Sequence, residues 1–257
     1  MLSVKPVGKI APEWPAEVEQ GLILTTNAMG IMTREPAPVA LKFAEHAGRA
    51  RRPVLEVGAA YGNASYPALE AGGTVIACDI AEDELTQLRA PVPLELQKHL
   101  ITIPGRFPDE LHFTAGSLSA VLAAQVFHFF DGPTVQTALS TIFGWLEPGE
   151  GKVYLVVMTP QLSYYVSFLA EFQQRKAAGD RWPGIFDPRV AATPEWRDRL
   201  PALVNLFDAD ILRRSVQEAG FVIEHLEPFC YKDFPDKHRT NGEEFLGIVG
   251  RKPISSL

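Results

Sequence analysis

The chain has 257 residues, of which 46% are hydrophobic and 21% are charged, and its formal net charge is −7. This combination suits one substantial globular core and argues against extended disorder. A nucleic-acid-binding surface usually brings an excess of basic residues, and the composition has none, so we expect no nucleic-acid partner.

Cysteine content and apolar runs bear on the cellular location of the protein. The two cysteines, Cys78 and Cys230, are too few for a disulfide framework and suit a reducing cytoplasm. The first residues lack the apolar stretch of a signal peptide, and no apolar run approaches the length of a membrane span. The sequence therefore predicts a cytoplasmic protein without a membrane partner, and it leaves the oligomeric state open.

Strand and helix patterns alternate over the first two thirds of the chain. Residues 1–35 are predicted to be an irregular N-terminal segment, because prolines recur in it. Buried strands are then predicted at 53–57, 74–78, 100–103, 120–124 and 153–157. Helical patterns occupy 36–47, 63–71, 82–89, 94–99 and 135–146. This order predicts an α/β fold with a doubly wound, mostly parallel sheet covered by helices on both faces.

The alternation stops after the fifth strand. Residues 161–206 hold a helical stripe and then a loop rich in proline and tryptophan, which predicts a helical insert that serves as a substrate lid. A helix over 208–219 and strands over 221–229 and 244–250 then complete a seven-stranded sheet whose last strand is antiparallel. We expect one domain over residues 1–257.

The turn after the first predicted strand is the first candidate binding element. Ligands of open parallel sheets bind outside the carboxyl ends of the strands. There the chain reads Gly58-Ala59-Ala60-Tyr61-Gly62, and such small residues let a backbone turn sharply and approach a ligand closely. Asp79 ends the next strand, where a carboxylate can accept hydrogen bonds from ribose hydroxyls. The pair predicts a site for a nucleoside-containing cofactor.

Glycine spacing separates the possible cofactors. The dinucleotide fingerprint needs glycine at the positions of Ala60 and Asn63, which disfavours an NAD(P)-dependent oxidoreductase without removing it as an alternative. A non-catalytic nucleotide-binding regulatory protein is a second alternative. The pattern Glu56-x-Gly58-x-x-x-Gly62 instead resembles motif I of the class I, Rossmann-like S-adenosylmethionine-dependent methyltransferases, with Ala60 in place of a glycine. The resemblance continues through Asp79, 120–128, 145–149 and 219–249.

This resemblance implies an enzyme with S-adenosylmethionine as cofactor and S-adenosylhomocysteine as product. It implies methyl transfer by in-line displacement to an oxygen or nitrogen of a small molecule, for example an aromatic one. The implied cofactor-binding residues follow the strand ends. They are Glu56 near the ammonium group, Gly58, Ala59, Ala60, Tyr61 and Gly62 around the methionine part, Asp79 at the ribose, Ile80, Arg106 and Phe107 around the adenine, and Ala124 and Gln125 beside the methionine chain.

Four further residues are candidates on chemical grounds. His128 follows the fourth strand and titrates near neutral pH, so it is the candidate base for a protonated acceptor. Tyr164 and Tyr165 of the insert are the next candidates, and Arg34 is a candidate partner for the cofactor carboxylate. The aromatic residues of the insert either line a substrate wall or form its own small core. Neither the histidines nor the cysteines are spaced as metal ligands, so no metal site is predicted. A peptide acceptor remains an alternative to a small molecule.

Overall fold

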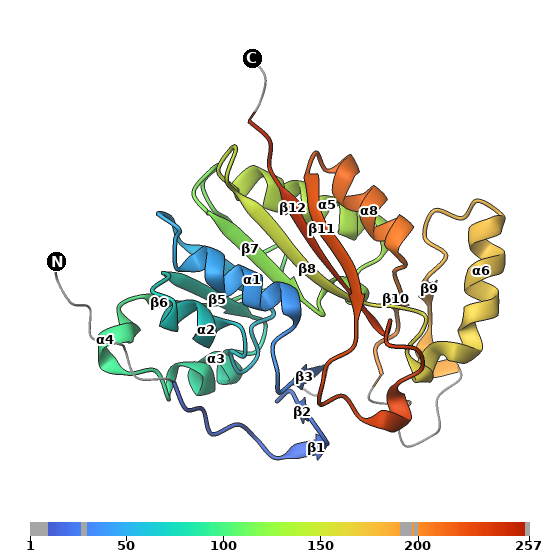
Figure 1. The fold of residues 1–257 in the computed structure, drawn as a ribbon, viewed down its shortest axis with the longest axis horizontal. Coiled ribbons are helices and arrows are strands. Elements are labelled where there is room, and N and C mark those ends of the chain that lie inside the picture. The colour runs from blue at the N-terminus through green and yellow to red at the C-terminus, as the bar shows by residue number, and fades with distance from the viewer. Residues whose placement is uncertain (1–9, 27–29, 191–196, 198–199, 255–257) are drawn as a thin grey trace.

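A seven-stranded sheet forms the centre of the protein in the computed structural model, which describes residues 10–26, 30–190, 197 and 200–254 (Figure 1). Its strands lie in the order β11, β12, β8, β7, β4, β5 and β6. Their bounds are β4 Val54–Val57, β5 Val75–Asp79, β6 Leu100–Pro104, β7 Ala120–Ala124, β8 Lys152–Met158, β11 Val222–Phe229 and β12 Phe245–Arg251. Neighbouring strands from β6 to β8 pair in parallel, and β12 runs antiparallel between β8 and β11. The predicted doubly wound, mostly parallel sheet with an antiparallel last strand is confirmed.

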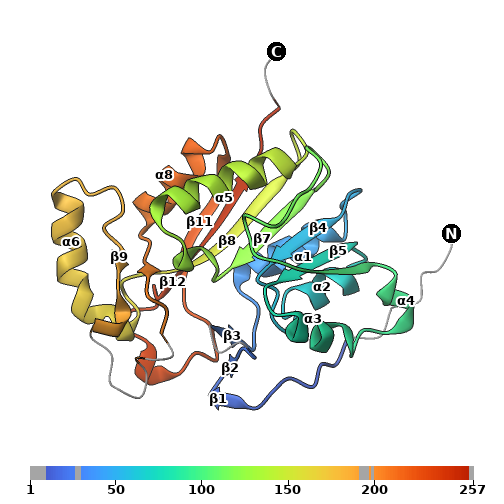
Figure 2. The ribbon, with the colours of Figure 1, turned by 180° about the vertical axis from the view of Figure 1, so that it is seen from behind.

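Helices cover both faces of this sheet (Figures 1 and 2). One face carries α1 (Pro38–Ala47), α2 (Ser65–Glu70) and α3 (Glu82–Arg89), whose buried side chains share a core with the strands; α4 (Leu94–Gln97) adds Leu96 to it. The other face carries α5 (Gly132–Trp145) and α8 (Ala209–Glu218). Both faces of the central strands are therefore buried, which explains why the strands read as continuous apolar runs.

The chain reverses its direction across the sheet between β4 and β7. From β4 it proceeds to β5 and β6 on one side, and it then returns to β7 and β8 on the other. Val57 of β4 lies opposite Ala123 of β7 in register, so the loops that leave these two strands emerge side by side. Ligands of doubly wound sheets bind at such a switch point.

The N-terminal segment differs from its prediction. Residues 1–35 were expected to be irregular, but β1 (Glu17–Glu19), β2 (Leu22–Leu24) and β3 (Ile31–Thr33) form a small antiparallel sheet. Residues 1–9 and 27–29 of this segment lie outside the described residues. Ile23 is fully buried because it packs against Ala60 and Tyr61, far along the sequence. Contacts of this range carry no local periodicity, which is why the sequence pattern missed the strands.

The insert after β8 contains more than the predicted helix. It holds the 3₁₀ segment η2 (Ser163–Phe168), α6 (Leu169–Ala177), β9 (Ile185–Phe186), the 3₁₀ turn η3 (Pro188–Val190) and β10 (Val204–Asn205). β9 and β10 pair antiparallel. Residues 191–196 and 198–199 of the predicted lid fall outside the described part of the chain. Phe168 and Phe172 belong to the same core cluster as β8 and α5, so the insert aromatics extend the main core.

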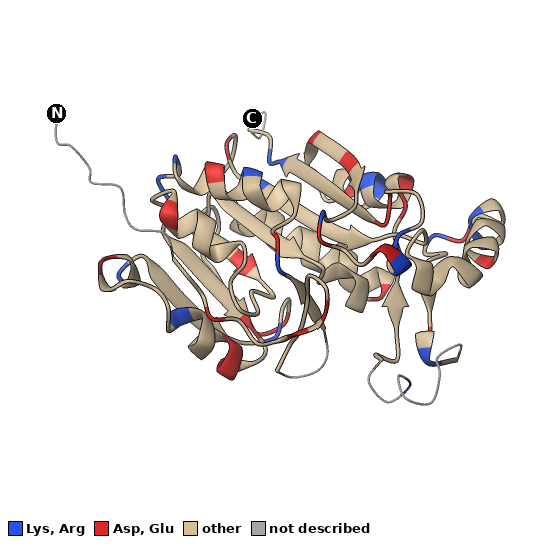
Figure 3. Ribbon diagram, turned by 60° about the horizontal axis from the view of Figure 1, so that its bottom comes forward, with Lys and Arg blue, Asp and Glu red and all other residues tan. Residues whose placement is uncertain are grey.

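Charges are mixed over the surface rather than segregated. Lys and Arg segments alternate with Asp and Glu segments in Figure 3. Within the described residues, every helix is too short or too polar to cross a membrane.

A close contact between α1 and β12 yields a stability prediction. A Cβ on Gly247 would lie 2.8 Å from Cγ1 of the fully buried Val39. We expect Gly247→Ala to lower the free energy of unfolding by about 1–3 kcal/mol, because the added methyl overpacks this contact. Gly144→Ala is the matched control, since no atom lies within 4 Å of its Cβ position in α5. It should raise stability by about 0.5–1 kcal/mol. Urea unfolding measures both, and equal effects would contradict this packing.

Candidate functional site

The loop that leaves β4 is shaped by backbone conformations that favour glycine. Gly58 has φ +69°, Ala60 has φ +43° and Gly62 has φ +86°. A Cβ on Gly58 would lie 2.5 Å from Cγ2 of Val126, and one on Gly62 would lie 2.7 Å from Cγ of Leu88. Both glycines are therefore required for space as well as for conformation. The loop turns tightly at the switch point, directly beside the segment that follows β7.

Asp79 at the end of β5 holds this loop in place. Its Oδ2 accepts a hydrogen bond from the backbone N–H of Ala60 at 2.9 Å, and its Oδ1 accepts one from Ala81 at 3.0 Å. Ala59 is buried and donates its N–H to the carbonyl of Cys78 at 3.0 Å. The structure thus brings together the loop and the acid that the sequence places on neighbouring strand ends. A carboxylate has about four acceptor sites, so Asp79 keeps capacity for further donors.

Glu56 is a buried carboxyl beside the same loop. Its side chain receives a hydrogen bond from the Ser65 hydroxyl at 2.5 Å. Burial raises the pKa of Glu56 to about 8, and nearby Asp79 adds to this rise while hydrogen bonds from Ser65 oppose it. In the described part of the chain, no basic side chain forms an ion pair with Glu56. The carboxyl is therefore largely protonated at neutral pH, and a cation placed next to it would favour ionisation.

Tyr61 joins the loop to the N-terminal sheet. The ring is 2% exposed, and its hydroxyl donates to the carbonyl of Leu24 at 3.1 Å. The neighbouring Asn63 donates through Nδ2 to the carbonyl of Thr33 at 2.8 Å. Thr26 donates through its backbone N–H and its hydroxyl to Oε1 of Glu84, each at 2.7 Å. The Tyr61 side chain is thus used in packing, and β2 and β3 form a wall along the loop.

The segment after β7 lies beside the loop that leaves β4. Ala124 ends the strand, and Gln125 has φ +57°, a conformation uncommon outside glycine. Its backbone N–H donates to Val156 at 2.8 Å, and its Nε2 donates to the hydroxyl of Tyr231 at 3.1 Å. Tyr231 is 5% exposed and follows β11. Sequence reasoning missed it, because it lies in a polar connecting segment and more than 100 residues away from its partner.

The residues predicted around the adenine divide into exposed and buried ones. Ile80 is 45% exposed and leaves a free apolar surface next to Asp79. Arg106 is exposed, and its backbone N–H donates to Oε2 of Glu110 at 2.7 Å. Phe107, expected near the adenine, lies on the buried side of this segment. It is 6% exposed and packs against Phe127 and other aromatic residues of the core, so it offers little free face to a ligand.

The candidate catalytic residues occupy three different environments. His128 is buried in the 3₁₀ turn η1 (Phe127–Phe129), where burial lowers its pKa to about 3 and its Nδ1 has no hydrogen-bond partner. Tyr165 packs edge-on against Phe186, and burial raises its pKa to about 12. Tyr164 is 52% exposed, and its ring centroid lies 4.1 Å from that of His238. Within the described residues, no hydrogen bond links these three candidates to one another.

Arg34 already has partners within the N-terminal segment. Its Nε lies 2.5 Å from Oε1 of Glu17, and its guanidinium lies 5.5 Å from the ring centroid of Trp14. The backbone N–H of Arg34 donates to the carbonyl of Gly21, and the backbone N–H of Gly21 donates to the Glu17 carboxylate. A ligand carboxylate would have to compete with Glu17 for the guanidinium.

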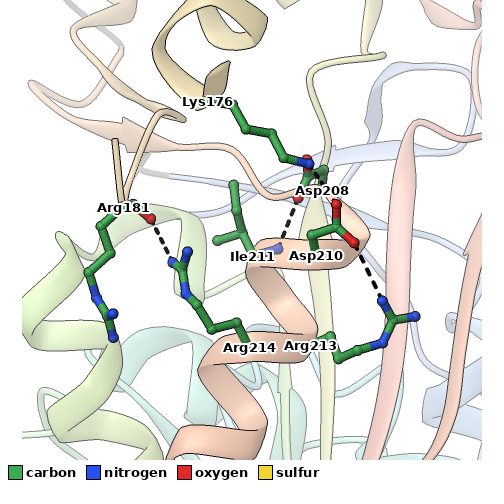
Figure 4. Close-up of polar contacts among 7 residues, drawn as sticks. All are labelled: Lys176, Arg181, Asp208, Asp210, Ile211, Arg213 and Arg214. Atoms are coloured by element: carbon green, nitrogen blue, oxygen red, sulfur yellow. Dashed lines mark hydrogen bonds and ion pairs between the residues drawn. The ribbon is translucent and has the colours of Figure 1, made fainter. Parts of the chain in front are cut away.

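A separate pocket lies between α6 and α8 (Figure 4). Its volume is about 500 Å³, and its lining comprises Lys176, Gly179, Asp180, Arg181, Asp210, Ile211 and Arg214. Lys176 bonds with Asp208 and Asp210, and Arg181 pairs with Glu218. These charges neutralise one another and fasten the insert to α8. The pocket contains none of the residues of the β4 loop.

Comparisons with known proteins bear on the fold and on the family. A family model described as "Methyltransferase domain" matches residues 54–149, which span β4 to the start of the turn before β8. A search of curated protein sequences finds no significant match.

Several solved structures share the fold. An S-adenosylmethionine-dependent methyltransferase from Methanosarcina mazei has a TM-score of 0.61 and 17% identity, over 86% of this chain and 100% of that one. One from Mesorhizobium loti has a TM-score of 0.59 and 19% identity, over 83% and 96%. The geranyl diphosphate C-methyltransferase from Streptomyces coelicolor A3(2) has a TM-score of 0.57 and 12% identity, over 82% and 79%.

These identities are low, so the likeness to solved structures concerns the fold. The family match covers the loop after β4, the acid at the end of β5 and the segment after β7. The matched segment is therefore similar to methyltransferase domains, and the chain has the fold of class I, Rossmann-like methyltransferases.

Proposed function

We propose that the protein transfers a methyl group from S-adenosylmethionine to an oxygen or nitrogen of a small acceptor molecule. The observation that carries this proposal is the buried carboxyl of Glu56, which has no basic partner among the described side chains and lies beside the tight loop after β4. A cofactor with an ammonium group would supply the missing cation.

The residues at the switch point fit such a cofactor. Asp79 keeps acceptor capacity for the ribose hydroxyls after it has bound Ala60 and Ala81. The loop from Gly58 to Gly62 provides close backbone approach for the methionine part, and Ile80 provides exposed apolar surface for the adenine. Ala60 stands where the family motif has glycine, yet its φ of +43° keeps the left-handed conformation there.

The bound cofactor would supply a methyl group that its sulfonium has already activated. The protein then has to align the acceptor and exclude water. We assign water exclusion to β2 and β3 on one side and to the insert on the other. His128 is proposed to contact the acceptor group as well, which requires the 3₁₀ turn η1 to open, because its neutral ring and its unpartnered Nδ1 are buried. Tyr164 and Tyr165 are proposed to contact the acceptor from the insert.

The second part of this proposal concerns which atom, and which class of molecule, receives the methyl group. The geranyl diphosphate enzyme that shares the fold is named for a carbon acceptor, so the fold alone does not select the acceptor atom. Oxygen or nitrogen is favoured here by the partly exposed, polar side chain of Gln125, which follows β7 beside the loop after β4.

Binding of the product tests the cofactor assignment. We expect S-adenosylhomocysteine to bind with a dissociation constant in the micromolar range in isothermal titration calorimetry. Asp79→Asn should weaken this binding at least tenfold, because one acceptor oxygen is replaced by a donor. Asp83→Asn, at an exposed position of α3, is the control and should leave the affinity unchanged. No binding of S-adenosylhomocysteine to the unmodified protein at several hundred micromolar would contradict the proposal.

The raised pKa of Glu56 predicts how the affinity for S-adenosylhomocysteine depends on pH. Its carboxyl has a pKa of about 8 in the free protein and must ionise next to an ammonium group. Binding should therefore release a proton below pH 8, so the affinity should rise between pH 6 and pH 8 by up to about tenfold per unit. Calorimetry in buffers of different ionisation enthalpy measures the released proton.

The matched variant is Glu56→Gln, which keeps the shape and removes the titration. It should bind more weakly at pH 8 and show no proton release. A wild-type affinity that stays constant from pH 6 to pH 8 would show that Glu56 does not meet the ammonium group.

The insert is proposed to act as the substrate lid. If it closes over the occupied crevice, backbone amide exchange in Ser163–Phe168 should slow at least threefold when S-adenosylhomocysteine is added. Hydrogen-exchange mass spectrometry measures this, with β11 at the edge of the sheet as the internal control. Unchanged exchange in η2 would contradict the lid.

A further inference from the structure

Ser65 connects the first turn of α2 with the buried carboxyl of Glu56 in β4. Its hydroxyl donates to Oε2 of Glu56 at 2.5 Å, and the two residues are 0% and 2% exposed. Serine near the start of a helix often serves as its cap, by accepting a hydrogen bond from a backbone N–H. In α2 the cap position is occupied by Ala64, which makes no side-chain cap. The serine hydroxyl therefore serves the carboxyl of a remote strand.

Contacts of the neighbouring Tyr66 hold Ser65 in place. The backbone N–H of Tyr66 donates to the carbonyl of Gly62 in the loop after β4 at 3.0 Å. The Tyr66 hydroxyl donates to the carbonyl of Leu88 in α3, also at 3.0 Å, and the residue is only 5% exposed. The start of α2 is thus fastened to both the loop and α3, which fixes the hydroxyl of Ser65 against Glu56.

The surroundings of Glu56 are otherwise mostly apolar. It lies opposite Ala77 of β5 and Leu122 of β7 in register, and the buried side chains of α1 are all apolar. Among the described residues, Asp79 of β5 is the charged neighbour that acts on the pKa of Glu56, and it raises this pKa. Tyr66 of α2 is a titratable neighbour, because Glu56 helps to raise its pKa. Neither neighbour favours the ionised form of Glu56.

A second serine–glutamate hydrogen bond shows what is particular to the first. Ser119 donates to Oε1 of Glu147 at 2.6 Å, at the opposite end of the parallel strands. Glu147 also forms an ion pair with Arg52 at 2.8 Å, whereas no described basic side chain pairs with Glu56. A hydroxyl donates more strongly to a carboxylate than to a neutral carboxyl. Ser65 is therefore the residue that makes ionisation of Glu56 accessible near neutral pH.

We propose that Ser65 is a positioning residue of the cofactor site, because its hydroxyl orients the carboxyl of Glu56 and favours the ionised form that an ammonium group requires. The inference rests on the proposed function and deepens it, since it assigns the group that sets the pH range of cofactor binding. A hydroxyl on Oε2 leaves Oε1 of the carboxylate to accept from the ammonium group.

Calorimetry with S-adenosylhomocysteine at several pH values tests this role. We expect Ser65→Ala to raise the pKa of Glu56 by about one unit, because the lost hydrogen bond favoured the charged form. Binding at pH 7 then has to remove a more firmly held proton, so the affinity should fall about tenfold. Near pH 9.5 Glu56 is largely ionised in both proteins, and the affinities should agree within about threefold. Titration of the ligand's own amine is common to both proteins and cancels in the ratio.

Two further variants control for the loss of a buried hydroxyl. Ser119→Ala removes the matched donor at the opposite end of the strands and should leave the affinity unchanged at both pH values. Ser65→Cys has a similar size and keeps a weaker donor. Its pH profile should lie between those of Ser65→Ala and the unmodified protein, and a profile that coincides with the unmodified one would count against the role of the hydroxyl.

A direct titration separates this inference from the proposed function. Carbon-13 NMR of protein labelled at the glutamate carboxyl follows the ionisation of Glu56 without any ligand, and Glu56→Gln identifies its signal. The midpoint should lie near pH 8 and move up by about one unit in Ser65→Ala.

The outcomes then fall into two groups. If S-adenosylhomocysteine binds but the midpoint stays in place, or if the affinity falls by the same factor at pH 7 and pH 9.5, the role of Ser65 is overturned while the cofactor assignment stands. If S-adenosylhomocysteine does not bind the unmodified protein, the proposed function fails, and the cofactor role of Ser65 fails with it, wherever the midpoint lies.

Discussion

The candidate site depends on one buried carboxylate at the end of β5. Asp79 accepts one backbone hydrogen bond from Ala60 and another from Ala81, so it joins the loop after β4 to the start of α3. Ala60 holds a left-handed conformation that costs a residue with a Cβ about 1 kcal/mol. The hydrogen bond from its N–H offsets this cost and keeps the loop tight. Without it, neither the position of Gly58 next to Val126 nor the approach of β2 and β3 to Tyr61 would be maintained.

The buried acids Asp79 and Glu56 lie at the same edge of the sheet, but different groups donate hydrogen bonds to them. Asp79 is met by two backbone donors, whereas the partners of Glu56 come from Ser65 alone. A buried carboxyl without a cation keeps its proton, and it is ready to ionise when a cation arrives. The free protein thus holds a buried carboxyl without a cationic partner beside the loop after β4, which is the observation on which the proposed cofactor site rests.

The segments beside the loop after β4 come from distant parts of the sequence. Gln125 follows β7 and Tyr231 follows β11, yet Nε2 of Gln125 donates a hydrogen bond to the Tyr231 hydroxyl. The N-terminal sheet contacts the chain at this loop through Tyr61 and Asn63.

The sequence by itself determined the parts of the protein that depend on local rules. Apolar runs and helical periodicity located the strands of the main sheet within one or two residues, and the glycines and Asp79 marked the binding edge because turn conformation and strand-end chemistry are encoded locally. Only the tertiary structure decided the directions of side chains and the pairing of remote segments. In the folded chain, Phe107 packs in the core and His128 is buried in a 3₁₀ turn. The proline-rich N-terminal segment forms strands, and Tyr231 is hydrogen-bonded to Gln125. These outcomes follow from packing between residues up to about 200 positions apart, which leaves no periodic trace in either partner.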